Sequence, residues 1–271
     1  MFFCFQCKSF SNNFSFFFEH YKADSMVRFL ANSDLHYRQV PRDEKHHHIG
    51  EMLTLMRNHT PQNKIEAVIL AGDLTAQGVS YDHSLGGCYC IKKHDDELKH
   101  LRKECLEPME QYTTVLPCAG NHDTYNHGRA KTWLNKKYGK NKQRTIGGIS
   151  FISCGIYPDA KALKFLRGLS DEIKAMPTVF YWHYPPIGPH HDWWSDIEIA
   201  AAFETLKQFK DVKGLFCGHA HGSYYMRWRE TFDLYVVGGP TFADVVCTKD
   251  DMNVRWFNKF NEHRQVERYD Y

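Results

Sequence analysis

Five short polar motifs lie along this chain in a fixed order, and each follows a run of mainly apolar residues. The motifs are Asp34-Leu35-His36, Gly72-Asp73, Gly120-Asn121-His122-Asp123, His183 and Gly218-His219-Ala220-His221. The preceding runs, such as 67–71 and 178–182, have the length and composition of buried β-strands. In layered α/β proteins, ligands gather at the carboxyl ends of strands. The sequence therefore predicts a fold in which each motif lies at the exit of a strand.

Two of the motifs place ligand-type side chains at alternate positions. Asp34 and His36 are two residues apart, and His219 and His221 repeat this spacing around the small Ala220. On a strand, residues i and i+2 point to the same face, so each pair can reach one metal ion.

The motifs supply two aspartates, one amide and four histidines as candidate ligands, and no cysteine. Carboxylate, amide and imidazole groups are hard or borderline ligands. They suit Mn, Fe, Zn or Mg better than a closed thiolate zinc site would. We therefore expect two adjacent divalent metal ions.

The order D-x-H, G-D, G-N-H-D, H and G-H-x-H resembles that of the calcineurin-like metallophosphoesterase superfamily, over roughly residues 27 to 270. This resemblance implies an α/β fold, a four-layer αββα sandwich of two mixed β-sheets flanked by helices. It also implies a dinuclear metal site at one sheet edge.

Two differences in the motifs indicate which branch of the superfamily this chain resembles. Asp123 follows Gly-Asn-His where the Ser/Thr protein phosphatases have Glu, and the first motif is Asp-Leu-His. The stretch from Gly72 to Ala76 lacks the tyrosine that purple acid phosphatases use. What remains resembles the small phosphodiesterases of the cyclic-nucleotide type.

The resemblance implies a role for each motif residue. The ligands of the first metal would be Asp34, His36 and His221. The ligands of the second metal would be Asn121, His183 and His219. Asp73 would bridge the two metals. His122 would face the leaving oxygen, and Asp123 would hold His122 in its working tautomer.

These roles imply a mechanism. Two metals about 3.5–4 Å apart can share a hydroxide that attacks phosphorus in line with the departing ester oxygen. His122 is the candidate proton donor to that oxygen, because histidine exchanges protons near neutral pH.

A phosphodiesterase with a small phosphoester substrate is the favoured function, and the alternative is a phosphomonoesterase, which would use the same ligands. The net charge of only +2 and the lack of long basic tracts give no strong nucleic-acid signal, which disfavours a nuclease. A scaffold that has lost catalysis is also disfavoured, because the chain keeps every ligand of the motif set.

The 271 residues, 42% of them hydrophobic, can form one substantial core. We expect one domain over residues 26–271 after a phenylalanine-rich extension over residues 1–25. That extension is read as poorly ordered, as a membrane-surface contact or as dispensable upstream sequence. The sequence contains no run of 18 apolar residues, so no transmembrane helix is predicted. The odd number of cysteines, nine, favours a reducing, cytoplasmic location.

Periodicity predicts helices over about 43–57 and 92–112, a hairpin over 145–156, and second-sheet strands over 224–228, 234–237 and 254–257. Residues 77–90 form either a lid or a plain surface insertion. The basic residues between Lys136 and Arg144 are read as a solvated helix end, with an anion-binding patch as the alternative.

The proline-rich segment 185–189 follows His183 and predicts a rigid, non-helical loop. The two histidines and two tryptophans after it could stack a substrate ring. Packing of these aromatic side chains onto the fold is the favoured alternative.

Overall fold

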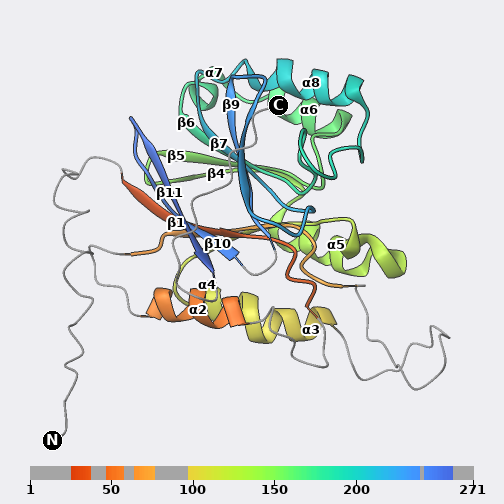
Figure 1. Ribbon diagram of the computed structural model, residues 1–271, viewed down its shortest axis with the longest axis vertical. Helices are drawn as coiled ribbons and strands as arrows, with labels where there is room; N and C mark the ends of the chain where they lie inside the picture. Colours follow the sequence, from red (N-terminus) through yellow and green to blue (C-terminus); the bar gives the residue numbers. More distant parts are fainter. Residues whose placement is uncertain (1–25, 38–46, 58–63, 77–96, 239–240, 259–271) are drawn as a thin grey trace, which may run out of the picture.

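The computed structural model describes residues 26–37, 47–57, 64–76, 97–238 and 241–258 (Figure 1). The predictions for residues 1–25, for the start of the helix at 43–46 and for the loop 77–90 lie outside this part. No helix among the described residues is long and apolar enough to cross a membrane.

Two mixed β-sheets form the centre of the fold. The first has the strand order β11-β10-β1-β2-β3. Its strands are β1 (Val27–Asn32), β2 (Ala67–Ala71), β3 (Thr114–Cys118), β10 (Thr241–Cys247) and β11 (Met252–Asn258). β1, β2 and β3 are parallel to one another, whereas β10 pairs antiparallel with both β1 and β11.

The second sheet has the order β4-β5-β6-β7-β9-β8. Its strands are β4 (Asn141–Ile146), β5 (Ile149–Cys154), β6 (Pro177–Tyr181), β7 (Asp211–Cys217), β8 (Tyr224–Trp228) and β9 (Phe232–Val236). β5, β6, β7 and β9 run parallel, and the edge strands β4 and β8 are antiparallel to their neighbours.

Helices cover the outer faces of both sheets (Figure 1). Those on the side of the first sheet are α2 (His47–Arg57), α3 (Glu97–Leu101), η4 (Arg102–Leu106), α4 (Glu107–Glu110) and α5 (Tyr125–Tyr138). Those on the side of the second sheet are α6 (Ala160–Arg167), α7 (Asp171–Lys174) and α8 (Asp196–Leu206). The four-layer αββα sandwich is therefore confirmed.

A dry aromatic layer joins the inner faces of the two sheets. The Phe29 ring lies 5.2 Å from that of Phe151 and 5.5 Å from that of Phe216, both edge-on. All three side chains are buried. Such a layer fixes the two sheets relative to each other and therefore fixes the positions of their strand ends.

The predicted strand 254–257 is real but lies in the first sheet, as part of β11, and not in the second. The chain leaves the second sheet after β9 and returns through β10, which pairs with β1 and which the sequence reading did not predict. Arg28 and Asp244 join β1 to β10 through two buried hydrogen bonds, of 2.8 and 2.7 Å. Alternation of apolar residues indicates burial but not the partner strand, which explains the wrong assignment.

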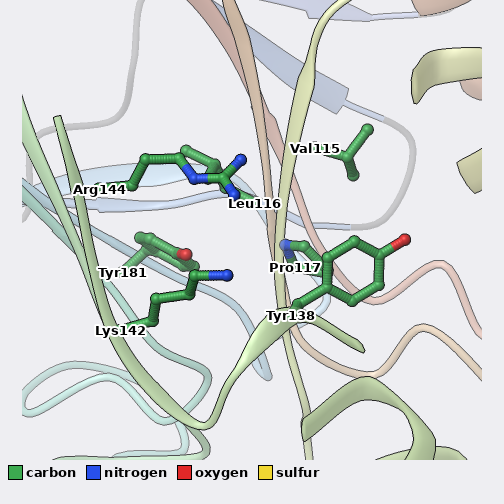
Figure 2. Close-up of a pocket in the computed structure, with 7 residues that line it drawn as sticks. All are labelled: Val115, Leu116, Pro117, Tyr138, Lys142, Arg144 and Tyr181. Carbon is green, nitrogen blue, oxygen red and sulfur yellow. The ribbon is translucent and has the colours of Figure 1, made fainter. Parts of the chain in front are cut away.

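The predicted hairpin is formed by β4 and β5. Part of the basic cluster lies on β4, and the rest lies at the end of α5. Lys136 and Lys137 end α5 as expected, but Lys142 and Arg144 lie on β4. These two side chains point toward β3 and line a small pocket (Figure 2). The other lining residues are Val115, Leu116, Pro117, Tyr138 and Tyr181. The helix-end reading therefore holds only for the first half of the cluster.

Candidate metal centre

The five motifs leave β1, β2, β3, β6 and β7 at the carboxyl ends of these strands. β1, β2 and β3 are neighbours in one sheet, and β6 and β7 are neighbours in the other. Because the sheets face each other, their strand ends bring residues far apart in sequence into contact.

The first ligand group comprises Asp34, His36, Asp73 and His221, whose donor atoms all lie within 4.8 Å of one another. The Nε2 atoms of His36 and His221 are 3.0 Å apart. Two imidazole nitrogens that bind one ion at right angles, each about 2.1 Å from it, would lie about 3.0 Å apart. The spacing of this pair therefore fits a common divalent ion.

The second ligand group comprises Asp73, His183 and His219, within the same 4.8 Å limit. Asn121 joins it, because its Oδ1 lies 2.9 Å from Nε2 of His183. Nδ1 of His183 lies 2.9 Å from the Ala71 carbonyl and donates to it. This hydrogen bond leaves Nε2 to face the site, as is usual for a metal-binding histidine.

Asp73 belongs to both groups, and its two oxygens differ. Oδ1 accepts a hydrogen bond of 2.8 Å from the backbone amide of His122. Oδ2 is buried and has no hydrogen-bond partner among the described residues. It lies 3.2 Å from Nε2 of His183 and 3.7 Å from Nε2 of His36. An unsatisfied buried oxygen between two sets of ligands fits a bridge between two divalent ions.

Most of the ligands have a strained backbone. A positive φ, rare outside glycine, occurs at Asp34 (53°), His36 (43°), Asp73 (51°), His219 (72°) and His221 (52°). Each such residue costs of order 1–3 kcal/mol and persists where the surrounding structure holds it. The chain therefore bends sharply at the exits of β1, β2 and β7, where these side chains turn toward the site.

Glycines allow the site to be this crowded. A Cβ on Gly120 would lie 2.1 Å from Oδ1 of Asp73, and one on Gly218 would lie 2.2 Å from Oγ of Ser33. At Gly120 and Gly218 the requirement is close approach, whereas Gly72 combines close approach to His183 with a φ of +92°.

Burial and mutual attraction set the charges of the site. Burial raises the pKa of Asp34 to about 7, although the nearby His183 opposes this shift. Burial also acts to raise the pKa of Asp73, but the charges of His183, His36 and His122 outweigh it and lower that pKa. Burial and the charge of His183 lower the pKa of His219 to about 4. The site thus favours an anionic Asp73 and a neutral His219, the states in which these residues bind cations. Burial acts to lower the pKa of His183, but the charge of Asp73 outweighs it and raises that pKa to about 9, so His183 must lose a proton to bind a cation.

His122 lies beside the ligands, and its ring centroid is 4.4 Å from that of His36. Its Nδ1 lies 2.7 Å from the Ala76 carbonyl. A carbonyl only accepts, so Nδ1 carries a proton. Nε2 is therefore the nitrogen near the bridging residue, 3.9 Å from Oδ2 of Asp73.

The expected partner of His122 was Asp123, and the structure corrects this. Asp123 is buried and accepts from backbone amides of Gly120 (2.9 Å), Thr75 (2.8 Å) and Leu74 (3.2 Å), and from the Thr75 hydroxyl (2.8 Å). The carboxylate therefore ties the loop after β3 to the loop after β2. The Ala76 carbonyl, in the loop after β2, orients His122.

The sequence reading missed three residues that support the ligands. The Ser33 hydroxyl lies between the Asp34 carboxylate and the Val237 carbonyl, and Thr75 donates to Asp123. A Cβ on Gly238 would come within 2.6 Å of Oδ2 of Asp34. Ser33 and Thr75 adjoin or follow the motif aspartates, and this adjacency was the available signal. Gly238 follows β9 and carried none.

The two tryptophans in the loop after His183 have different environments. Trp194 is buried and donates from Nε1 to the Pro185 carbonyl at 3.1 Å, which confirms packing onto the fold for this residue. Trp193 is exposed and lies beside His219, with ring centroids 4.9 Å apart.

The chain was compared with known proteins. The sequence profile described as calcineurin-like phosphoesterase matches residues 27–223, a span that contains all five motifs. No curated protein sequence matches the chain significantly.

Two solved structures share the fold. A dimetal phosphatase from Danio rerio superposes with a TM-score of 0.52 at 11% identity, over 84% of this chain and 98% of that chain. A 5′-nucleotidase from Candida albicans superposes with a TM-score of 0.51 at 15% identity, over 86% of this chain and 51% of that chain. This chain therefore spans about half the length of the nucleotidase. At these identities, the likeness concerns the fold.

Proposed function

Because the chain belongs to the calcineurin-like phosphoesterase family and is a hydrolase of phosphoester bonds, we propose that it is a phosphodiesterase acting on a small phosphodiester. The observation that carries this proposal is Oδ2 of Asp73, a buried oxygen without a hydrogen-bond partner among the described residues, which both ligand groups share. The motif variants at Asp123 and at Gly72–Ala76 support the diesterase branch over the phosphatase branches.

We assign the first metal to Asp34, His36 and His221, the second to Asn121, His183 and His219, and the bridge to Asp73. When bound, two divalent ions would supply Lewis acidity toward the phosphate oxygens and a water activated for attack. The donor set suits Mn, Fe, Zn or Mg.

His122 is assigned proton transfer to the leaving oxygen. The Ala76 carbonyl holds the ring through Nδ1, so Nε2 is the atom that would carry the transferred proton. Asp123 is assigned a positioning role, because it fixes the two loops that carry Asp73, Ala76 and His122. The chain thus holds the candidate proton donor through a backbone carbonyl, in loops that Asp123 ties together.

The alternative is a phosphomonoesterase, and the neighbours from Danio rerio and Candida albicans are a phosphatase and a nucleotidase. The test is hydrolysis of bis-p-nitrophenyl phosphate against p-nitrophenyl phosphate by the metal-stripped full chain, before and after Mn²⁺, Zn²⁺, Mg²⁺ or Fe²⁺ is added.

Metal-restored cleavage that favours the diester supports the proposal. A preference for the monoester would replace it with the alternative, and failure to cleave either ester while two metals are bound would reject both. A matched control is His100→Asn, because His100 is a partly exposed histidine paired with Glu104.

We also propose that the protein works in a reducing compartment such as the cytoplasm. The five cysteines among the described residues are free and buried, as Cys105, Cys118, Cys154, Cys217 and Cys247. Location of the tagged full chain in the secretory pathway would contradict this proposal.

A further inference from the structure

Two large, exposed aromatic side chains lie beside histidines of the metal centre. Among the described residues, three large hydrophobic side chains are exposed, namely Tyr125 (45% exposed), Trp193 (54%) and Ile197 (82%). Two of the three contact a histidine ring of the site, Tyr125 at His122 and Trp193 at His219. Exposed aromatic surface beside a polar cleft is typical of a binding surface.

Trp193 stands edge-on to a proposed metal ligand. Its ring centroid is 4.9 Å from that of His219, with an interplanar angle of 87°. Tyr184 contacts both rings, at 5.8 Å from Trp193 and 4.7 Å from His219. The indole therefore borders the second ligand group, where one ester substituent of a bound phosphodiester would leave the site.

The loop that carries Trp193 is fixed on both sides. Trp194 is buried and hydrogen-bonded to the Pro185 carbonyl, and the Tyr224 hydroxyl donates to the Pro189 carbonyl at 3.4 Å. Immediately after Trp194, Ser195 caps α8 together with Glu198. The exposed indole is thus held in place before any ligand arrives, which lowers the entropy cost of stacking on it.

Tyr125 borders the group that would face the leaving oxygen. It begins α5, and its ring lies 4.9 Å from that of His122 at an angle of 58°. The His122 ring in turn contacts His36 of the first ligand group. Aromatic side chains thus border both the proton donor and the second ligand group.

We propose that Trp193 forms an aromatic platform that binds a planar ring of the substrate and that Tyr125 contacts the leaving group, so that the natural substrate is a phosphodiester of a nucleoside or aryl alcohol. This inference rests on the proposed phosphodiesterase function and specifies its substrate class. Rings of this kind stack on indole and phenol faces without a need for base-specific hydrogen bonds. The small net charge matches a small ester rather than a polymer.

The test compares two phosphodiesters with the same leaving group, the p-nitrophenyl esters of thymidine 5′-phosphate and of ethyl phosphate, on the metal-loaded full chain. The measured quantity is the ratio of kcat/KM for the thymidine ester to that for the ethyl ester. We expect this ratio to exceed one in the unaltered protein. Trp193→Ala should reduce it by roughly 5- to 150-fold, the usual range for one stacked base. Tyr125→Ala should reduce kcat/KM for both esters, because the leaving group is aromatic in each.

Two variants serve as controls. Trp193→Phe keeps a ring and should restore much of the ratio. Ile197→Ala removes an exposed apolar side chain of α8 for which no contact with the ligands was found, and should leave the ratio unchanged. A ratio near one in the unaltered protein, or one that survives Trp193→Ala, overturns the platform while leaving the phosphodiesterase proposal intact.

A binding measurement separates the two proposals if neither ester is cleaved. Adenosine monophosphate should quench the fluorescence of Trp193, whereas ribose 5-phosphate, which lacks the base, should not. The quenching should disappear in Trp193→Ala. Equal responses to both compounds, or no response to either, would overturn the platform whatever the result for hydrolysis.

Discussion

The same strands behave differently along their length. On β1, β5 and β7, Phe29 packs edge-on against Phe151 and Phe216 in a dry layer. A few residues further on, β1 and β7 lead into Asp34 and His219, which are polar and have positive φ angles. Hydrogen bonds from the Asp34 amide to the Gly72 carbonyl (3.0 Å) and from the His36 amide to the Asp73 carbonyl (2.9 Å) hold this backbone locally, and packing in the first region fixes the strands that carry it. This metal centre therefore depends on distant apolar packing as much as on its ligands.

Asp73→Asn should disrupt the polar ends of the strands without disturbing the apolar layer. The change keeps the shape of the side chain but removes the negative charge that both ligand groups share. We expect loss of both metals and activity at the level of the metal-stripped protein. Metal analysis after gel filtration, together with kcat, checks this. Retention of two ions per chain would show that Asp73 does not bridge them.

His122→Asn removes the proposed proton donor and leaves every assigned ligand in place. We expect kcat to fall by about 10²–10⁴-fold while two metals stay bound. The effect should shrink for esters whose leaving group needs no proton, so p-nitrophenyl and alkyl leaving groups should be compared. An equal loss for both would argue that His122 only positions substrate.

Phe216→Ala disrupts the aromatic layer between the sheets and leaves the polar strand ends unaltered. Removal of a buried aromatic ring costs about 3–5 kcal/mol of unfolding free energy, which denaturant titration measures. If apolar packing holds the strained ligands, the metal-stripped variant should also rebind metal more weakly than the unaltered chain. Loss of stability with unchanged metal affinity would mean that the two regions are independent.

Ser33→Ala should give the smallest effect, because it removes a support of Asp34 and no ligand. Loss of such a contact typically weakens metal binding by about 10–100-fold. Competition with a chelating dye gives this affinity. Thr231→Ala, at an exposed hydroxyl in the β8–β9 turn, is the matched control. Unchanged affinity in Ser33→Ala would place the support of Asp34 in its backbone contacts.

The sequence predicted the strand exits because they depend on local patterns, whereas the four layers were implied by the family resemblance. A buried parallel strand is a short apolar run, and the residues after it carry the chemistry. The partner of each strand is a long-range property. The sequence reading therefore placed β11 in the wrong sheet and missed β10.

Contacts between side chains and the backbone also could not be predicted from the sequence. Every residue has a carbonyl group, so nothing in the sequence singled out Ala76 as the partner of His122. The adjacent tryptophans show the same limit. Outside a helix or strand no periodicity indicates which of Trp193 and Trp194 is buried, and only the fold separates them.

The pairing of β1 with β10 has a consequence for how the protein is made. Arg28 lies near the start of the described chain, and its partner Asp244 lies 216 residues later. The ribosome has therefore synthesised every motif residue before it synthesises β10, the antiparallel neighbour of β1. Until then, the β1 edge that pairs with β10 is open to other extended segments of the nascent polypeptide or of its neighbours. Chaperones that shield β1 during translation would thus protect the yield of this protein.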